Sequence, residues 1–227
     1  MAEQLTFDLP VRESRKRGDF FVSDANALAV AKLEAVETWP NGKLVLVGPE
    51  GSGKTHLGHV WAEANDALPG TVGGLLASDI PQINTPVLLE TMDHNGPMDA
   101  AEEEALFHFH NHMISQGLPF LMLARRPPAQ WNIALPDLKS RMEAADIVRI
   151  EPPDDALLAA VLLKQFADRQ IEVAPSVINF LVTHMNRSFA EAERLVEELD
   201  RTALAEARAV TRALAQRVLD KGPQDAR

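Results

Sequence analysis

An uninterrupted phosphate-loop pattern, "GPEGSGKT" at residues 48–55, constrains the fold of this chain more than any other feature. It fits GxxxxGK[ST] at every defined position. A short apolar run, "KLVLVG" (43–48), leads into it, and "KTHLGHVWAEAND" continues as a helical pattern. Glycines let such a loop turn so that several backbone N–H groups point at bound phosphates. The strand–loop–helix context predicts a nucleotide-binding fold of the P-loop class.

Each part of the loop has an expected role. Lys54 is predicted to reach the β- and γ-phosphates, and the hydroxyl of Thr55 to ligate Mg²⁺. The helix that begins beside Gly53 adds its positive N-terminal end. The residues expected to surround bound ADP or ATP at this loop are Gly48, Pro49, Glu50, Gly51, Ser52, Gly53, Lys54, Thr55 and His56.

Short apolar runs recur along the first two thirds of the chain, with helical stretches between most of them. The expected strands are residues 43–48, 72–77, 86–90, 118–124 and 146–150, and residues 24–38 predict a helix that ends before Pro40. Strands that alternate with helices predict an α/β fold with a parallel sheet covered by helices on both faces.

The pattern changes at Glu151, where "EPPDD" ends the last expected strand. Asp154 or Asp155 can cap the following helix. Four helical segments follow with no convincing strand between them, which predicts a small all-α domain. The expected organisation is a polar N-terminal arm at 1–17, an α/β nucleotide-binding domain at 18–150 and a helical domain at 151–227.

The composition of the chain indicates where the protein is located in the cell and what kind of partner it binds. The chain has no cysteine, which fits a reducing cytoplasm, and its polar start is not a signal peptide. We expect no membrane association, because no apolar run approaches the ~18 residues that span a bilayer. The net charge of −11 argues against a large DNA-binding surface, since DNA affinity rests on clustered Lys and Arg. A protein partner is the better expectation, with DNA contacted only indirectly.

The acidic residues expected beside the metal are unusual. The run "PVLLE" ends in Glu90, which can ligate Mg²⁺ directly or through water, and Asp93 is the competing candidate. Thr91 stands where hydrolases of this type carry the acid that orients the attacking water. General-base assistance is typically worth about 10²–10⁴-fold, so we expect weak hydrolysis by the chain alone.

The histidines of "HFHNH" suggest a metal-binding site, because His108 and His112 would lie on the same face of a helix. We disfavour that reading because no third ligand is evident. Glu102, Glu103 and Glu104 precede them on what we expect to be an exposed helix.

Three further stretches resemble one family. "RRPPAQWNIALPDLKSRM" (125–142) resembles the sensor-to-arginine-finger stretch of bacterial initiator-type AAA+ proteins, and "DFFVSDAN" (19–26) resembles their adenine-packing entry segment. "QLTFDLP" (4–10) is similar to peptides that bind the β sliding clamp of the replicase. Together they look like the Hda-type regulators, DnaA-related AAA+ proteins that inactivate the replication initiator. The resemblance implies an AAA+ core followed by a helical lid.

The resemblance also implies residue roles. Arg141 corresponds to the arginine finger that enters a neighbouring subunit's nucleotide site, and Arg187, with Arg194 as a rival, to the second sensor. Val22 and Asn26 fall in the segment that packs on adenine. The clamp-binding residues of the N-terminal peptide are Gln4, Leu5, Phe7 and Leu9. The implied partners are the DnaA initiator, the clamp and further copies of the chain.

The chain departs from the family pattern at Thr91 and at Arg125, where the first sensor is normally polar or acidic. The leading interpretation is therefore a nucleotide-binding regulator that docks on the clamp and promotes ATP hydrolysis by DnaA. A self-contained ATPase, such as a helicase-loader-like remodeller using Glu90 or Asp93, is the alternative. The initiator itself is the weakest reading, because we expect no room after the helical domain for a DNA-binding helix-turn-helix domain.

Overall fold

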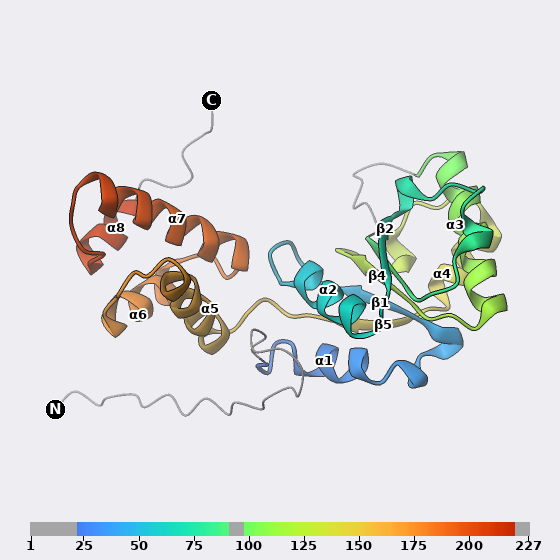
Figure 1. Ribbon diagram of the computed structural model, residues 1–227, viewed down its shortest axis with the longest axis horizontal. Helices are drawn as coiled ribbons and strands as arrows, with labels where there is room; N and C mark the ends of the chain where they lie inside the picture. Colours follow the sequence, from blue (N-terminus) through green and yellow to red (C-terminus); the bar gives the residue numbers. More distant parts are fainter. Residues whose placement is uncertain (1–21, 91–97, 221–227) are drawn as a thin grey trace. The chain divides into compact units, whose positions relative to one another are not determined.

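The computed structural model describes residues 22–90 and 98–220. The chain divides into two compact units, one formed by Asn26–Glu151 and one that begins at Pro152 and includes residues 22–25. Figure 1 shows strands and helices in the first unit, and the four helices from α5 onward in the second. The α/β part and the helical part thus separate at the break that "EPPDD" makes in the sequence.

Within the described residues, the first unit is built on a five-stranded sheet with the order β2-β3-β4-β1-β5. All neighbouring strands pair in parallel. The three central strands are almost fully buried and rich in Val and Leu, as expected where helices cover both faces. This confirms the predicted α/β class. The strands are β1 (Lys43–Val47), β2 (Leu68–Thr71), β3 (Val87–Glu90), β4 (Phe120–Ala124) and β5 (Asp146–Arg149).

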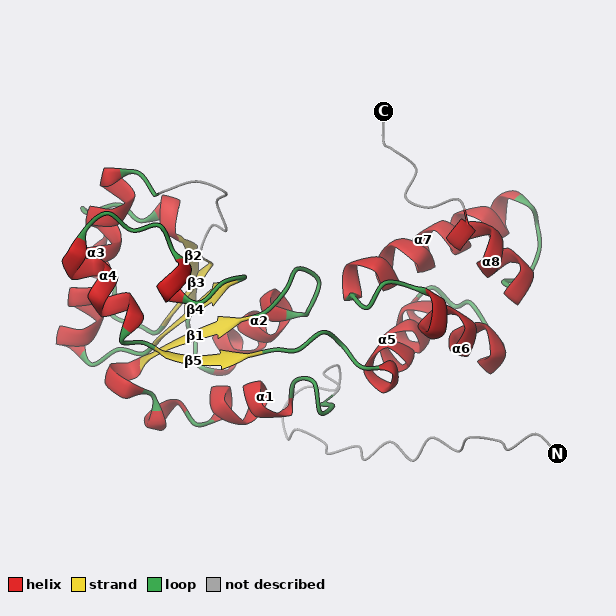
Figure 2. Cartoon of the chain, turned by 180° about the vertical axis from the view of Figure 1, so that it is seen from behind, coloured by secondary structure: helices red, strands yellow, loops and turns green. Residues whose placement is uncertain are grey.

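Helices cover the two faces of this sheet in pairs (Figure 2). Val45 and Val47 of β1 belong to the core packed under α3 (Ala100–Gln116) and α4 (Pro136–Glu143). Side chains alternate along a strand, so Leu44 and Leu46 point to the other face. That face carries α2 (Lys54–Ala64). At Gly58 of α2 an added Cβ would lie 2.8 Å from a methyl group of Leu123, so the absence of a side chain permits the close packing.

The predicted strand at residues 72–77 is wrong. The strand that pairs with β3 is β2, four residues upstream, and Val72–Gly74 forms a single 3-10 turn instead. β2 is an exposed edge strand, so it lacks the apolar run that marks the central strands. Pro69 lies within it, which an edge position tolerates because one side of the strand has no partner for the missing N–H.

The predicted helix at residues 24–38 is shorter in the structure. α1 spans Ala27–Glu34, and a 3-10 turn, Val36–Thr38, follows it. Its buried residues are Ala29 and Leu33, one turn apart, whereas Leu28 is 73% exposed. The indole of the next buried residue, Trp39, donates to the carbonyl of Lys32 at 2.8 Å and stacks on Trp61 of α2. A buried aromatic pair therefore fixes the end of this segment.

The second unit is a bundle of four helices, α5 (Asp155–Asp168), α6 (Pro175–His184), α7 (Phe189–Ala205) and α8 (Arg212–Asp220). The carboxylate of Asp154 caps α5 by accepting from the Leu157 N–H at 2.8 Å, and the hydroxyl of Ser188 caps α7. Pro175 opens α6, where its missing N–H is no loss. Local capping therefore marks where these helices begin.

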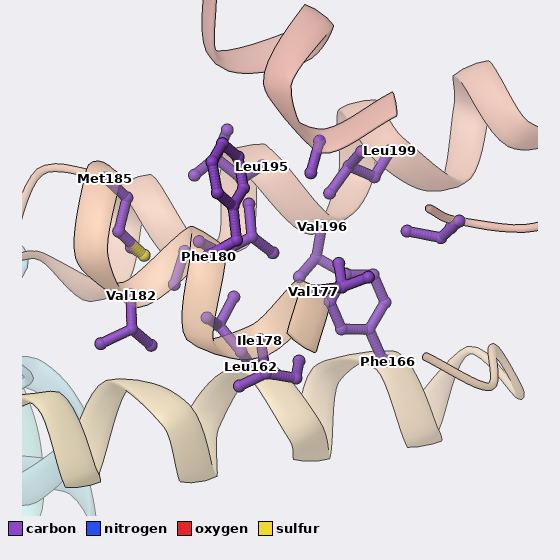
Figure 3. Close-up of a cluster of buried hydrophobic side chains, with 14 of the residues drawn as sticks. Leu162, Phe166, Val177, Ile178, Phe180, Val182, Met185, Leu195, Val196 and Leu199 are labelled. Atoms are coloured by element: carbon purple, nitrogen blue, oxygen red, sulfur yellow. The ribbon is translucent and has the colours of Figure 1, made fainter. Parts of the chain in front are cut away.

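Side chains from all four helices fill the centre of this bundle, as Figure 3 shows for part of it. Leu162 and Phe166 of α5 lie against Val177 and Ile178 of α6, and Leu195 and Leu199 of α7 close the cluster. The bundle thus has a hydrophobic core of its own. No helix in the described ranges combines the length and the apolarity needed to cross a bilayer.

Candidate functional site

The phosphate loop joins the end of β1 to the start of α2. Gly51 and Gly53 have φ values of 69° and 87°, in the region that favours glycine. A Cβ on Gly48 would lie 2.8 Å from the Ser52 hydroxyl and 3.0 Å from the Ile150 carbonyl, so this position also requires glycine. The three glycines of the motif are therefore explained by the geometry of the loop.

Polar groups line the inside of the loop. The hydroxyl of Ser52 is buried and has no hydrogen-bond partner among the residues that the structure describes. The ammonium of Lys54 donates to the carbonyl of Pro49 at 2.7 Å, across the loop. Thr55 and His56 are exposed on the first turn of α2. A charged group, a buried hydroxyl without a partner and a helix N-terminus thus converge on a cradle whose donors fit phosphate oxygens.

Glu90 ends β3, and its carboxylate lies 3.4 Å from the ring of His59 on α2. His59 follows Thr55 by four residues, so the two share one face of the helix. Glu90 therefore lies beside the face of α2 that carries Thr55. The Glu90 side chain is 41% exposed, which leaves its oxygens accessible to a hydrated Mg²⁺. Thr91 and the rival acid Asp93 lie outside the described residues.

Arg125 follows the last residue of β4, and its guanidinium pairs with the carboxylate of Glu50 at 3.1 Å. The end of β4 and the phosphate loop are thus joined by an ion pair. Both side chains are substantially exposed, so the pair contributes little to stability. The pair occupies the position where the resemblance implies a polar or acidic sensor.

Arg141 belongs to the last turn of α4, and its guanidinium carbon lies 5.1 Å from the centre of the Phe107 ring on α3. Its backbone carbonyl accepts a hydrogen bond from Lys43, the first residue of β1. The phosphate loop follows Val47, the last residue of that strand. Five residues of strand separate the two ends by roughly 13–16 Å. The end of α4 therefore lies near the amino-terminal ends of the strands, whereas the phosphate loop follows the carboxyl-terminal end of β1.

Both candidate second sensors form ion pairs within the helical unit. Arg187 pairs with Asp155 at 2.6 Å, and both side chains are more than half exposed. Arg194 donates two hydrogen bonds to Glu191, at 2.9 and 2.8 Å, which raise the pKa of its guanidinium. The exposed pair of Arg187 is the easier one to exchange for a phosphate.

The structure describes Val22 and Asn26 of the predicted adenine-packing segment but not the N-terminal peptide. Val22 is half-buried, and Asn26 is buried at the start of α1, where its carbonyl accepts from the Val30 N–H at 2.9 Å. The predicted clamp-binding residues lie outside the described residues; they are Gln4, Leu5, Phe7 and Leu9.

Two buried charged residues near α4, Glu103 and Lys43, could not be recognised from the sequence. Glu103, which we expected on an exposed helix, is 5% exposed, and it accepts from the N–H groups of Ala134 and Leu135. Lys43 is 3% exposed, and burial together with the Arg141 charge lowers the pKa of its ammonium. Neither residue carries a local signal, because its partners lie far away in the sequence.

The three histidines of the 108–112 segment have separate environments. His110 is buried beside the ammonium of Lys43 at 3.3 Å, and burial with the Lys43 charge lowers its pKa to about 4. His112 contacts the carbonyl of Ile83, and His108 lies near Glu104 on the surface. Their rings therefore point to three different sets of neighbours.

Comparisons with known proteins agree with this architecture. Residues 154–219 match the family model described as "Hda, lid domain". Domain III of the Thermotoga maritima replication initiation protein DnaA superposes with a TM-score of 0.75 at 18% identity, over 90% of this chain and 95% of that one.

Two longer proteins have the same fold. AMPPCP-bound DnaA from Aquifex aeolicus gives a TM-score of 0.63 at 19% identity, over 83% of this chain and 68% of that chain. The Thermotoga maritima RuvB Holliday junction branch migration motor gives a TM-score of 0.65 at 17% identity, over 88% of this chain and 70% of that chain. A further DNA replication initiation factor is covered over only 64% of its length. Residues 154–219 therefore resemble the lid domain of Hda, and the chain has the fold that DnaA domain III and RuvB share.

Proposed function

We propose that this protein binds ADP or ATP with Mg²⁺ in its phosphate loop and promotes ATP hydrolysis by a DnaA-type initiator. In this role Arg141 enters the nucleotide site of the initiator and stabilises the charge that develops in the transition state. The bound nucleotide sets the conformation of the regulator, and the hydrolysed nucleotide belongs to the partner.

The observation that carries this proposal is the separation between Arg141 and the phosphate loop of the same chain. The carbonyl of Arg141 is held by Lys43 at the start of β1, whereas the loop follows the other end of that strand. A guanidinium at the opposite end of the strands is badly placed for its own nucleotide, so a role at a nucleotide requires the site of a partner. The Hda-type lid at residues 154–219 supports a DnaA-related regulator as the class.

Several features support nucleotide binding. Ser52, Lys54 and the N-terminus of α2 offer donors to the phosphates, and Thr55 and Glu90 offer oxygens to Mg²⁺. We infer that Arg187 exchanges its exposed pair with Asp155 for a phosphate when nucleotide is bound. Denaturing the purified protein and separating the released compounds by chromatography tests this proposal, with ADP or ATP as the expected co-purified ligand.

Clamp docking by residues 4–10 completes the proposal. It rests on the resemblance of "QLTFDLP" to clamp-binding peptides, with Gln4 donating hydrogen bonds and Leu5, Phe7 and Leu9 entering an apolar pocket. The function is tested by adding the protein to ATP-loaded initiator with the clamp on DNA. Conversion of the initiator's ATP to ADP should accelerate, and an unchanged rate would contradict the proposal.

A self-contained ATPase is the second candidate, and one observation favours it. Glu90 lies beside His59, on the face of α2 that carries Thr55, and an acid near Thr55 could serve metal-assisted hydrolysis. Single-turnover hydrolysis by the purified protein with Mg²⁺ separates the two candidates, with Lys54→Ala as the control for contaminating ATPase. We expect a rate far below the ~10 s⁻¹ median of enzymes. A robust rate that depends on Lys54 would instead select the second candidate.

A further inference from the structure

One face of α3 contacts α4 directly at two points and through Lys43 of β1 at a third. Glu103, Phe107 and His110 follow each other at spacings of four and three residues, so they form one stripe of the helix. Glu103 contacts the start of α4, Phe107 contacts the Arg141 guanidinium, and His110 contacts the lysine that binds the end of α4. This stripe differs from an ordinary apolar helix face because two of its three members are polar and buried.

At the N-terminus of α4 the contact is a buried carboxylate. The two oxygens of Glu103 accept from the N–H of Ala134 at 2.7 Å and of Leu135 at 2.8 Å. Leu135 is the N-cap residue of α4, and its own side chain cannot satisfy the backbone donors there. A negative charge at this end also complements the helix dipole. Glu103 therefore fixes the backbone of the two residues that lead into α4.

At the C-terminus of α4 the contact is a buried ammonium. The Nζ of Lys43 donates to the carbonyl of Arg141 at 2.5 Å and lies 3.3 Å from the ring of His110. Lys43 and His110 are only 3% and 4% exposed. A positive charge at this end again complements the helix dipole. The two ends of α4 are therefore held by opposite charges.

Two buried charges around so short a helix carry a large cost in desolvation free energy. α4 has eight residues, fewer than a helix needs to be stable by itself, so its position depends on tertiary contacts. Leu138 and Met142 already supply buried apolar contacts. Burying a charge costs desolvation free energy even when the charge is paired. The best-supported role of buried charges is to enforce one specific geometry. The geometry enforced here is that of the segment carrying Arg141.

We propose that Glu103, Phe107 and the Lys43–His110 pair are positioning residues that orient Arg141 for its action on a partner's nucleotide. The proposal rests on the proposed function of Arg141. Glu103 and Lys43 fix the axial position of α4, and the Phe107 ring orients the guanidinium by a cation–π contact before the partner arrives. This pre-organisation places the charge without reorganisation at the moment of reaction.

The first test is amide hydrogen exchange of the full-length protein. Glu103→Gln keeps the shape of the side chain but turns one acceptor into a donor, so either Ala134 or Leu135 loses its partner. The amide exchange rate in peptides that span residues 134–143 should rise at least about tenfold, and the rates elsewhere should change little. Glu104→Gln, next on the same helix but 74% exposed, is the matched control and should exchange as the wild type. Unchanged exchange in Glu103→Gln would overturn the proposal.

The second test measures ATP hydrolysis by a DnaA-type initiator as each variant is titrated to saturation. Misplacement of a catalytic group by about 1 Å can cost ~10²-fold, so Glu103→Gln and Phe107→Leu should lower the maximal rate at least about tenfold. The concentration giving half-maximal stimulation should stay within twofold. A purely structural role predicts the reverse, because a smaller folded fraction raises that concentration and leaves the maximal rate intact.

Arg141→Ala separates this inference from the proposed function. If Arg141→Ala abolishes stimulation while Glu103→Gln and Phe107→Leu keep the wild-type maximal rate, the positioning proposal fails and the arginine finger stands. If Arg141→Ala stimulates like the wild type, the proposed function fails, and the positioning role is overturned with it.

Discussion

At the scale of single residues, Lys54 decides whether the phosphate loop can hold a nucleotide. Its ammonium donates to the carbonyl of Pro49, inside the same loop that its charge is expected to serve. A phosphate that enters the loop offers this ammonium a charged acceptor in place of a neutral one, and hydrogen bonds to charged groups are the stronger class.

Replacing Lys54 by Ala should therefore lower the affinity for ADP at least about tenfold, which corresponds to the ~1.5–3 kcal/mol of a hydrogen bond to a charged group. Isothermal titration calorimetry measures the change. Lys139→Ala, which removes an exposed charge from α4, serves as the control and should bind like the wild type. Equal affinities for all three proteins would show that the loop is not the binding site.

His110 provides a prediction about pH. Its pKa lies at about 4 in the folded protein, against 6.5 for the ordinary imidazole, because burial and the charges of Lys43 and Arg141 oppose protonation. Between these two pH values the unfolded chain binds a proton that the folded chain excludes. The free energy of unfolding should therefore fall as pH drops from about 6.5 to about 4, by up to ~3 kcal/mol.

Urea unfolding at pH 7 and at pH 4.5 measures this dependence. Other groups also titrate in this range, so the informative quantity is the difference between the wild type and His110→Asn. The variant should lose clearly less stability over the interval. Identical losses in the two proteins would show that His110 is not the group responsible.

At the scale of elements, the central strands and the phosphate loop could be predicted because their signals are consecutive in the sequence. "KLVLVG" and "GPEGSGKT" contain their own evidence, with buried apolar residues in the first and required glycines in the second. β2 could not be predicted, because an exposed edge strand needs neither apolar residues nor every backbone N–H. Its place follows only from pairing with β3.

The surroundings of α4 could not be predicted for a different reason. The acceptor for the N–H groups at its start is Glu103, 31 and 32 residues earlier, and the donor to its last turn is Lys43, 98 residues earlier. A charged residue beside other charged residues, such as Glu103 between Glu102 and Glu104, has the sequence signature of a solvated helix. Only the fold distinguishes the buried member from the exposed ones.

Packing of α2 on the sheet yields a prediction at this scale. A Cβ at Gly58 would meet the Leu123 and Leu88 side chains at 2.8–3.1 Å, whereas one at Gly70 in β2 would meet nothing within 4 Å. Gly58→Val should destabilise the protein by about 1–3 kcal/mol through overpacking, and Gly70→Val should be close to neutral. Thermal unfolding of the two variants compares them directly. A neutral Gly58→Val would contradict the close approach of helix and sheet.

At the scale of the whole molecule, the chain consists of two units, each with its own hydrophobic core, and an N-terminal peptide that resembles clamp-binding sequences. Deleting residues 1–10 should abolish binding to the β sliding clamp, because the whole predicted motif is removed. The unfolding temperature should change little, since a polar terminal arm is expected to contribute little to a hydrophobic core. A pull-down with purified clamp tests the binding, and retained binding by the deletion variant would show that another surface docks.

The central claim is that Arg141 acts on a partner's nucleotide and not on its own. The most direct test is the rate of ATP hydrolysis by a DnaA-type initiator at saturating regulator, with the clamp on DNA, for wild type, Arg141→Ala and Lys139→Ala. Removing an arginine finger typically costs about 10³–10⁵-fold in kcat. Arg141→Ala should therefore lose essentially all stimulation while its own affinity for ADP stays unchanged, and Lys139→Ala should keep most of it. Full stimulation by Arg141→Ala, or a matching loss of its own nucleotide affinity, would contradict the account.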